Sequence, residues 1–149
     1  MDCRQLFLEL ESILNDFLEE VNKKKLGDRA TTEWSVKDVL GHITYWHQYY
    51  AQQYESLSRG EKPYFHRSLA GKNVEGRQKK KYTSKKKLIK ELLQANQSLK
   101  TSILEKKVPQ MRYMASRTYE THEFLEVVIR HIQSHTLQVR RAKHINHSH

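Results

Sequence analysis

The sequence predicts an all-α domain built as a four-helix bundle, and three observations lead to this prediction. The 149 residues include only 5 glycines and 2 prolines, which argues against a turn-rich sandwich or barrel. Apolar residues, 37% of the chain, recur at steps of three and four in four separate segments. Helices of about 20 to 25 residues have the length of a bundle. We therefore predict a single domain over residues 1–143 and a flexible, histidine-containing tail at 144–149.

Apolar spacing and capping residues set the limits of the predicted helices, which are about 2–25, 35–59, 84–105 and 119–143. Ser35 followed three residues later by Asp38 has the form of a capping box with aspartate in place of glutamate. Gly60 ends the second helix, and the fourth helix starts near Thr118 or Thr121. We find no internal repeat, and no alternation that would predict a sheet.

The segment 60–82 is predicted to be a long basic connector, because it has no sustained apolar period. More than twenty residues are enough for this connector to cross the bundle. Residues 59–90 contain twelve Lys or Arg and two Glu, so they account for the whole net charge of +10. A nucleic-acid-binding module would concentrate its phosphate contacts in this way. Charge alone is weak evidence, and we favour a solvated connector that keeps the protein soluble.

Composition also bears on where the protein works. No apolar run approaches the roughly 20 residues of a membrane-spanning helix, so we expect no membrane association. The N-terminal residues lack the basic and apolar pattern of a secretory leader. Cys3 is the single cysteine and has no internal disulfide partner, which suits a reducing compartment. We therefore expect a cytoplasmic protein.

Histidines on the predicted fourth helix are the clearest chemical signal. His131 and His135 lie one turn apart, on the same apolar stripe as Phe124, Val128 and Val139. An inward polar group without a partner costs about 1–3 kcal/mol, and a divalent metal would take both imidazoles at once. The alternative is that each histidine finds its own hydrogen-bond acceptor, or that the pair lies at the rim of the core.

His42 strengthens the metal interpretation, since it lies at the edge of the apolar stripe of the second helix. An inward histidine from another helix would complete a three-histidine site with open positions. His47 lies about 140° further around the same helix, so it cannot face the same ion. His122 is more than two turns from His131, and His66 in the connector has no positional argument for it. The tail holds three more histidines, which are His144, His147 and His149.

Two stretches resemble the signatures of the DinB/YfiT-like metal-binding bundles. The first is Trp34-Ser-Val-Lys-Asp-Val-Leu-Gly-His42-Ile-Thr-Tyr-Trp46, which resembles W-[ST]-x-x-[DE]-[LV]-L-x-H-[LI]-x-x-W. The second is His131-Ile-Gln-Ser-His135-Thr-Leu-Gln138-Val, which resembles H-x-x-x-H-x-x-Q-[IV]. Less specifically, Asn73, Arg77, Thr83 and the leucine-rich third helix resemble the ClbS/DfsB-type branch. The resemblance covers nearly the whole chain.

This resemblance implies a bundle of up-up-down-down topology, with a long crossover between the second and third helices, and a homodimer. It also implies a divalent metal held by His42, His131 and His135. Nickel and zinc are the metals expected first, followed by iron and manganese. Characterised relatives of this kind are thiol S-transferases that use bacillithiol, mycothiol or glutathione, and hydrolases that detoxify electrophiles. We therefore expect a small-molecule substrate and a low-molecular-weight thiol as cosubstrate.

The chemistry of such a site yields further expectations. A three-histidine metal with open positions would lower the pKa of bound water or thiol and so supply a nucleophile. Gln138 would orient a ligand by a hydrogen bond, or else face solvent or an interface. Tyr45, Trp46 and Tyr49 would wall a substrate pocket near His42, or else pack in the core and at its rim. No carboxylate on the apolar stripes stands out as a general base, so bound hydroxide would have to serve.

Two other functions stay open at this point. One is a metal-binding bundle without catalysis, acting as a sensor or scaffold in a stress response. The other is a nucleic-acid-binding module that uses the basic segment 59–90.

Overall fold

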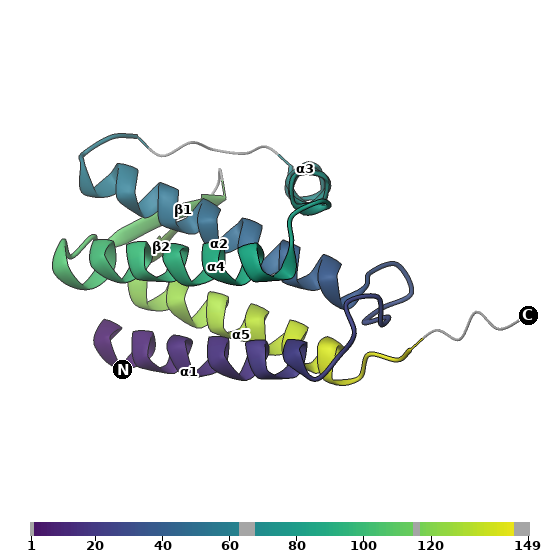
Figure 1. Cartoon of the computed structure of the whole chain (residues 1–149). Coiled ribbons are helices and arrows are strands. Elements are labelled where there is room, and N and C mark those ends of the chain that lie inside the picture. The colour runs from purple at the N-terminus through teal and green to yellow at the C-terminus, as the bar shows by residue number, and fades with distance from the viewer. Residues whose placement is uncertain (1, 63–67, 115–116, 145–149) are drawn as a thin grey trace, which may run out of the picture.

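Four long helices form the body of the protein, and a shorter helix crosses over them (Figure 1). The computed structural model describes residues 2–62, 68–114 and 117–144. The long helices are α1 (Cys3–Asn22), α2 (Val36–Ser58), α4 (Lys85–Lys100) and α5 (Thr121–Arg140). A π-helical turn, η1 (Thr101–Glu105), extends α4. The prediction of a mostly helical fold is therefore confirmed, and each helix starts and ends within a few residues of its predicted limits.

The predicted start of the second helix is confirmed in its capping geometry. Ser35 Oγ accepts a hydrogen bond from the backbone N–H of Asp38 at 3.1 Å. Asp38 Oδ2 in turn accepts one from the backbone N–H of Ser35 at 3.0 Å. This reciprocal pair satisfies two backbone donors that a helix start leaves free, so it fixes where α2 begins.

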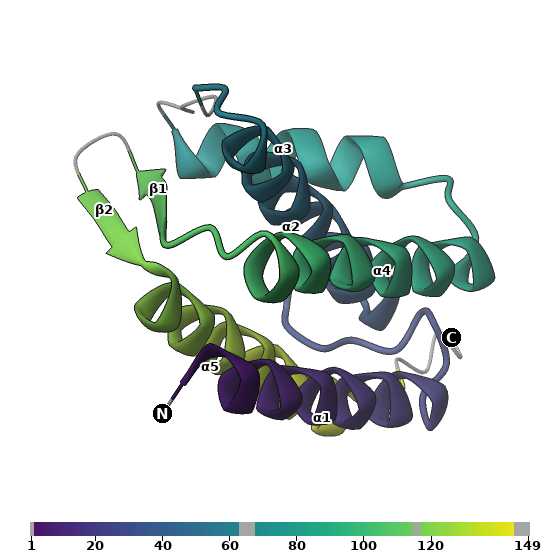
Figure 2. The ribbon, with the colours of Figure 1, turned by 90° about the vertical axis from the view of Figure 1, so that its left-hand side faces the viewer.

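The helices pack in two layers. α1 packs mainly against α5, and α2 mainly against α4 (Figure 2). The core lies between the layers, and its largest fully buried side chains are Tyr54, Phe7, Phe17, Phe124, Leu10, Leu14, Leu40, Leu88, Leu92, Leu99, Met111 and Leu125. Leucines and aromatic residues from all four long helices therefore build one continuous core. No helix in the described part of the chain is long and apolar enough to span a bilayer.

The chain directions correct the expected up-up-down-down order. α1 and α5 run parallel, because Glu20 and Arg140 in their last turns pair at 3.3 Å. α2 and α5 run antiparallel, since Tyr54 near the end of α2 hydrogen-bonds Thr121 at the start of α5, at 3.0 Å. Figure 1 shows α2 and α4 running in the same direction, so the order is up-down-down-up. The predicted long crossover is therefore the return path that a parallel α2–α4 pair requires.

The crossover itself contains a helix that the sequence did not predict. α3 (Leu69–Lys80) occupies the middle of the predicted connector 60–82, and Ser68 Oγ caps it by accepting from the backbone N–H of Gly71 at 3.0 Å. Its sequence is mostly polar, and Gly76 is its one buried residue among those described. An apolar stripe is therefore missing, and α3 is stabilised instead by contacts with α2.

A β-hairpin replaces part of the predicted link between the last two long helices. β1 (Gln110–Met114) and β2 (Arg117–Glu120) pair antiparallel, with Met111 opposite Tyr119, and the register shifts between Arg112 and Met114. β2 is largely polar and exposed, so it has no apolar–polar alternation that would predict a strand. The hairpin lies at the end of the bundle where α2 ends and α5 begins (Figure 2).

The last residue of the predicted domain, Lys143, and the first residue of the predicted tail, His144, are held against the loop between α1 and α2. Lys143 and Arg29 exchange two backbone hydrogen bonds, at 2.8 and 3.1 Å. His144 Nδ1 lies 3.4 Å from the buried carboxylate of Asp28. The rest of the predicted tail, 145–149, lies outside the described residues.

Replacement of Gly76 by alanine tests how α3 is docked. The added Cβ would lie 2.7 Å from Cγ of Tyr45, so the Tyr45 ring or α3 must shift. We expect Gly76→Ala to lower the free energy of unfolding by about 1–3 kcal/mol in chemical denaturation. Gly71→Ala in the same helix is the control, because its Cβ would meet nothing closer than 3.4 Å. Equal stability of the two variants would show that α3 is not packed closely on Tyr45.

Candidate metal centre

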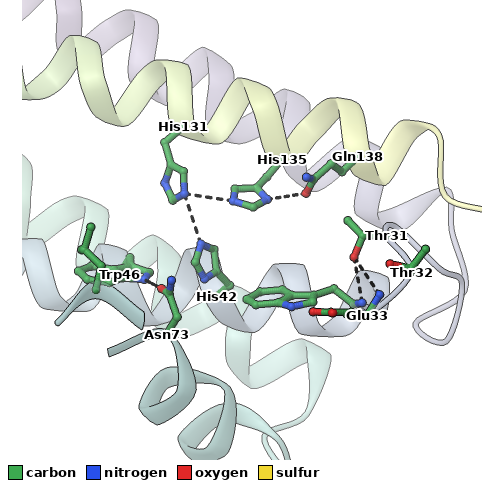
Figure 3. A pocket seen from close by; sticks show the side chains of 11 residues that line it. Thr31, Thr32, Glu33, His42, Trp46, Asn73, His131, His135 and Gln138 are labelled. Carbon is green, nitrogen blue, oxygen red and sulfur yellow. Dashed lines mark hydrogen bonds between the residues drawn. The ribbon is translucent and has the colours of Figure 1, made fainter. Parts of the chain in front are cut away.

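Three histidines from two helices converge at the end of the bundle opposite the hairpin. His42 lies in the first third of α2, whereas His131 and His135 lie one turn apart in the second half of α5. Because α2 and α5 run antiparallel, these parts of the two helices lie close together. The Nε2 atom of His131 lies 3.3 Å from Nε2 of His42 and 3.1 Å from Nε2 of His135 (Figure 3). The structure therefore brings together all three histidines that the sequence singled out.

The spacing of these nitrogens fits a divalent transition metal. The three ligand nitrogens lie within 4.8 Å of one another. Metal–nitrogen bonds of 2.0–2.1 Å place neighbouring nitrogens about 3.3 Å apart in a tetrahedral site and about 2.9 Å apart in an octahedral one. Imidazole is a ligand that zinc, nickel, copper and iron share. The site can therefore hold such an ion, and its donors do not distinguish between these metals.

Hydrogen bonds among the three histidines explain their close approach less well than a bound metal ion does. Nε2 of His131 faces both other imidazoles, and a ring nitrogen carries either one proton or one lone pair. It can therefore satisfy one of its two neighbours by a direct hydrogen bond, but not both. A cation accepts the lone pairs of all three nitrogens at once, so it satisfies the cluster completely.

Burial keeps these imidazoles neutral. Desolvation, together with the other two histidines, lowers the pKa of His42 from 6.5 to about 3. The same causes, with His135 as the neighbouring group, lower the pKa of His131 to about 4. The pKa of His135 is lowered by burial as well, although its hydrogen bond to Gln138 opposes the shift. At neutral pH each imidazole therefore keeps a lone pair for a metal.

Gln138 fixes the orientation of one ligand. Its Oε1 lies 2.7 Å from Nδ1 of His135, so the imidazole donates its Nδ1 proton to the amide oxygen. The lone pair of His135 then resides on Nε2, the atom that faces the cluster. Of the two roles considered for Gln138, the structure therefore supports the one in which it positions a metal ligand.

A cavity of about 460 Å³ opens beside the histidines. Its volume is in the range of small-molecule sites. The residues that line it come from the loop after α1, from α2, α3 and α5, and are Thr31, Thr32, Glu33, Trp34, His42, Trp46, Leu69, Asn73, His131, His135 and Gln138. The three candidate ligands therefore face a space that a small molecule can occupy.

Of the three aromatic residues predicted to wall the pocket, Trp46 alone lines this cavity. The Tyr45 ring packs against Gly76 of α3, and its hydroxyl lies 3.4 Å from Nζ of Lys72. The Tyr49 ring lies beneath the same ammonium group, which is 5.1 Å from the ring centre. Tyr45 and Tyr49 therefore take the packing role that was their alternative, and they support α3.

Several lining residues were not identified from the sequence as pocket residues. Trp34 packs edge-on against His42, with ring centres 4.9 Å apart, and Thr31 Oγ1 accepts a hydrogen bond from the backbone N–H of Trp34 at 3.0 Å. Glu33 brings a carboxylate to the cavity from the loop. Helical periodicity did not identify Glu33, because the residue lies in a loop, outside every apolar helical stripe. For Trp34 and Asn73, the only sequence signal was the family resemblance.

The other histidines do not join the cluster. His47 is buried on the opposite side of α2, where its Nε2–H donates to Oδ1 of Asn96 on α4 at 2.9 Å. His122 is exposed in the first turn of α5. His144 faces Asp28. His66, His147 and His149 lie outside the described residues.

Ion pairs involve five of the described cations of the basic segment 59–90, which are Arg59, Lys72, Arg77, Lys79 and Lys80. Lys80 on α3 pairs with Glu91 on α4 at 2.6 Å. Arg77 lies 3.4 Å from Asp38 on α2, and its guanidinium group covers the Trp34 ring at 5.6 Å. Arg77 and Lys80 therefore anchor α3 to α2 and α4.

Comparison of the chain with protein-family models, characterised proteins and solved structures finds no match.

Gln138→Leu tests whether the amide positions His135. Loss of a residue that hydrogen-bonds a metal ligand typically lowers metal affinity by roughly 10–100-fold. We expect a fall of that size for Gln138→Leu. Gln138→Glu keeps an acceptor for Nδ1–H and should retain the affinity. Gln133→Leu, an exposed position on the same helix, is the matched control. Competition with a chromogenic chelator measures the affinities, and equal values for Gln138→Leu and Gln133→Leu would contradict this role.

Because the His47 side chain is buried, we expect the protein to lose stability in acid. Burial lowers its folded-state pKa from 6.5 to about 4, so the unfolded chain takes up a proton first as the pH falls. The free energy of unfolding should therefore decrease between pH 6.5 and 4, by roughly 3 kcal/mol from this residue. In His47→Gln that part of the pH dependence should disappear. Chemical denaturation in the presence of a chelator measures it, and His122→Gln is the control. An unchanged pH profile in His47→Gln would contradict the prediction.

Proposed function

We propose that this chain is a divalent-metal protein of the DinB/YfiT-like type, and that it transfers a thiol to, or hydrolyses, a small electrophile. The observation that carries the proposal is the convergence of three neutral imidazoles on a cavity of about 460 Å³. A metal centre for structure alone would be closed by a fourth protein ligand. Here the three ligands face open space.

The ligand set favours activation of a nucleophile. Three neutral imidazoles leave the double positive charge of an ion uncompensated, and such an ion lowers the pKa of a coordinated water or thiol toward neutrality. The protein residues hold the ion and keep it facing the cavity, with Gln138 orienting His135. The indole rings of Trp34 and Trp46 give the cavity an apolar wall.

Glu33 is proposed as the proton acceptor. It supplies the one carboxylate among the described residues that line the cavity, and its side chain is exposed to solvent. A carboxylate at the mouth can take a proton from the nucleophile and pass it to bulk water. A bound metal would lower the pKa of the nucleophile and so ease this proton transfer.

Metal analysis tests the ligand assignment. Protein prepared without an affinity tag should contain close to one divalent ion per chain. His42→Ala, His131→Ala and His135→Ala should each lower metal affinity by roughly 100-fold or more, since each removes a ligand and not merely its support. His122→Ala, on α5 but outside the cluster, should bind metal like the wild type. Full metal content in His131→Ala would show that the ion lies elsewhere.

Activity assays on the same proteins separate catalysis from simple metal binding. Metal-loaded wild type should speed the conjugation of small electrophiles with a low-molecular-weight thiol, or their hydrolysis. Chelation and His131→Ala should remove this acceleration, and Glu33→Gln should reduce it. One bound ion per chain without turnover of any electrophile would instead favour a sensor or scaffold.

A further inference from the structure

Asn73 is placed by the crossover at the wall of the candidate site. It lies on α3 and lines the same cavity as the three histidines. Figure 3 shows its side chain extending from α3 toward His42. The Nε1–H group of Trp46 donates to Oδ1 of Asn73 at 2.7 Å. The amide therefore reaches the site from the side opposite His131 and His135.

The hydrogen bond from Trp46 orients this amide. With Oδ1 engaged as an acceptor, the amide presents its Nδ2 protons, which only donate. Trp46 is itself fixed, because it is 3% exposed and packs edge-on against Tyr45 and Tyr49. The close contact of Gly76 with Tyr45 fixes α3 against the same group of aromatic side chains. Asn73 is therefore a donor held by a rigid support.

The rest of the cavity lining shows why this donor matters. None of the described residues that line the cavity is a lysine or arginine, so no side-chain cation is available to bind an anionic group. The amide oxygen of Gln138 accepts from His135, and its Nε2 protons belong to the α5 side of the cavity. The indole rings of Trp34 and Trp46, together with Leu69, offer apolar surface. On the α3 side, the Asn73 amide is thus the group able to recognise an oxygen atom.

We propose that Asn73 donates a hydrogen bond from Nδ2 to a carbonyl or carboxylate oxygen of a ligand that is bound through another atom to the metal at His42, His131 and His135. The ligand class is a small molecule with a metal-binding atom, such as a thiolate sulfur, and an acceptor oxygen close to it. Its apolar part packs against Trp34 and Trp46. This inference rests on the metal site of the proposed function and adds a residue that selects the ligand.

Two thiols that differ in their acceptor oxygen provide the test. Mercaptoacetate carries a thiolate and a carboxylate, whereas ethanethiol carries the thiolate alone. Cobalt(II)-substituted protein reports binding of either thiol through sulfur-to-cobalt charge-transfer absorption. Hydrogen bonds to charged groups typically change affinity by about tenfold or more, so wild type should bind mercaptoacetate about tenfold more tightly than ethanethiol.

Variants at position 73 should remove this difference. Asn73→Ala eliminates the donor without adding charge, and it should weaken mercaptoacetate binding about tenfold while leaving ethanethiol unchanged. Asn73→Asp keeps an acceptor for Trp46 but offers no donor, so it should lose mercaptoacetate binding at least as strongly, even if the alanine variant folds poorly. Gln78→Ala, at an exposed position on α3, is the control for changes in that helix.

The outcomes separate this inference from the metal site on which it rests. If wild type fails to bind cobalt in a histidine environment, the proposed function falls and the role of Asn73 falls with it. If cobalt binds but position 73 affects both thiols equally, or neither, the metal site stands and the role of Asn73 is overturned.

Discussion

The antiparallel contact between α2 and α5 is the constraint on which the rest of the structure depends. One end of this contact is fixed by the hydrogen bond from Tyr54 to Thr121, and the other end holds the histidine cluster. Imidazoles shielded from water need partners, because an unpaired polar group costs about 1–3 kcal/mol. The contact between α2 and α5 therefore carries the histidines, which need a partner, toward one end. Toward the other end, the hydrogen bond between Tyr54 and Thr121 and apolar packing stabilise it.

The parallel arrangement of α2 and α4 explains why α3 contributes residues to the cavity wall. A chain that leaves the end of α2 must return to the other end of the bundle before α4 can begin. α3, which belongs to this crossover, lies against α2 at the end of the bundle where α4 begins (Figure 1). α3 brings Leu69 and Asn73 to the histidines on this return path. The residues that would contact a ligand thus follow from the topology, although the helix that carries them has almost no apolar residues.

The predictable and unpredictable parts of the protein differ in physical origin. The long helices and the cluster of His42, His131 and His135 could be predicted, because buried positions on a long helix repeat with its period. α3 could not, since contacts with Tyr45 and Glu91 replace an apolar stripe. Glu33 belongs to a loop, whose conformation depends on local turns and on α3. The expected directions of the helices were wrong. They came from the family resemblance alone, because helix periodicity carries no information about direction.

The histidine cluster also has a mechanical consequence. His42 and His131 are 89 residues apart in the chain, and they belong to different layers of the bundle. An ion bound to both would be a crosslink that closes a long loop of the chain, much as a disulfide does. Such a crosslink would lower the conformational entropy of the unfolded chain. Occupancy would then set the lifetime of the protein as well as its chemistry. A cell short of the metal would hold less of the protein, and not merely an idle form of it.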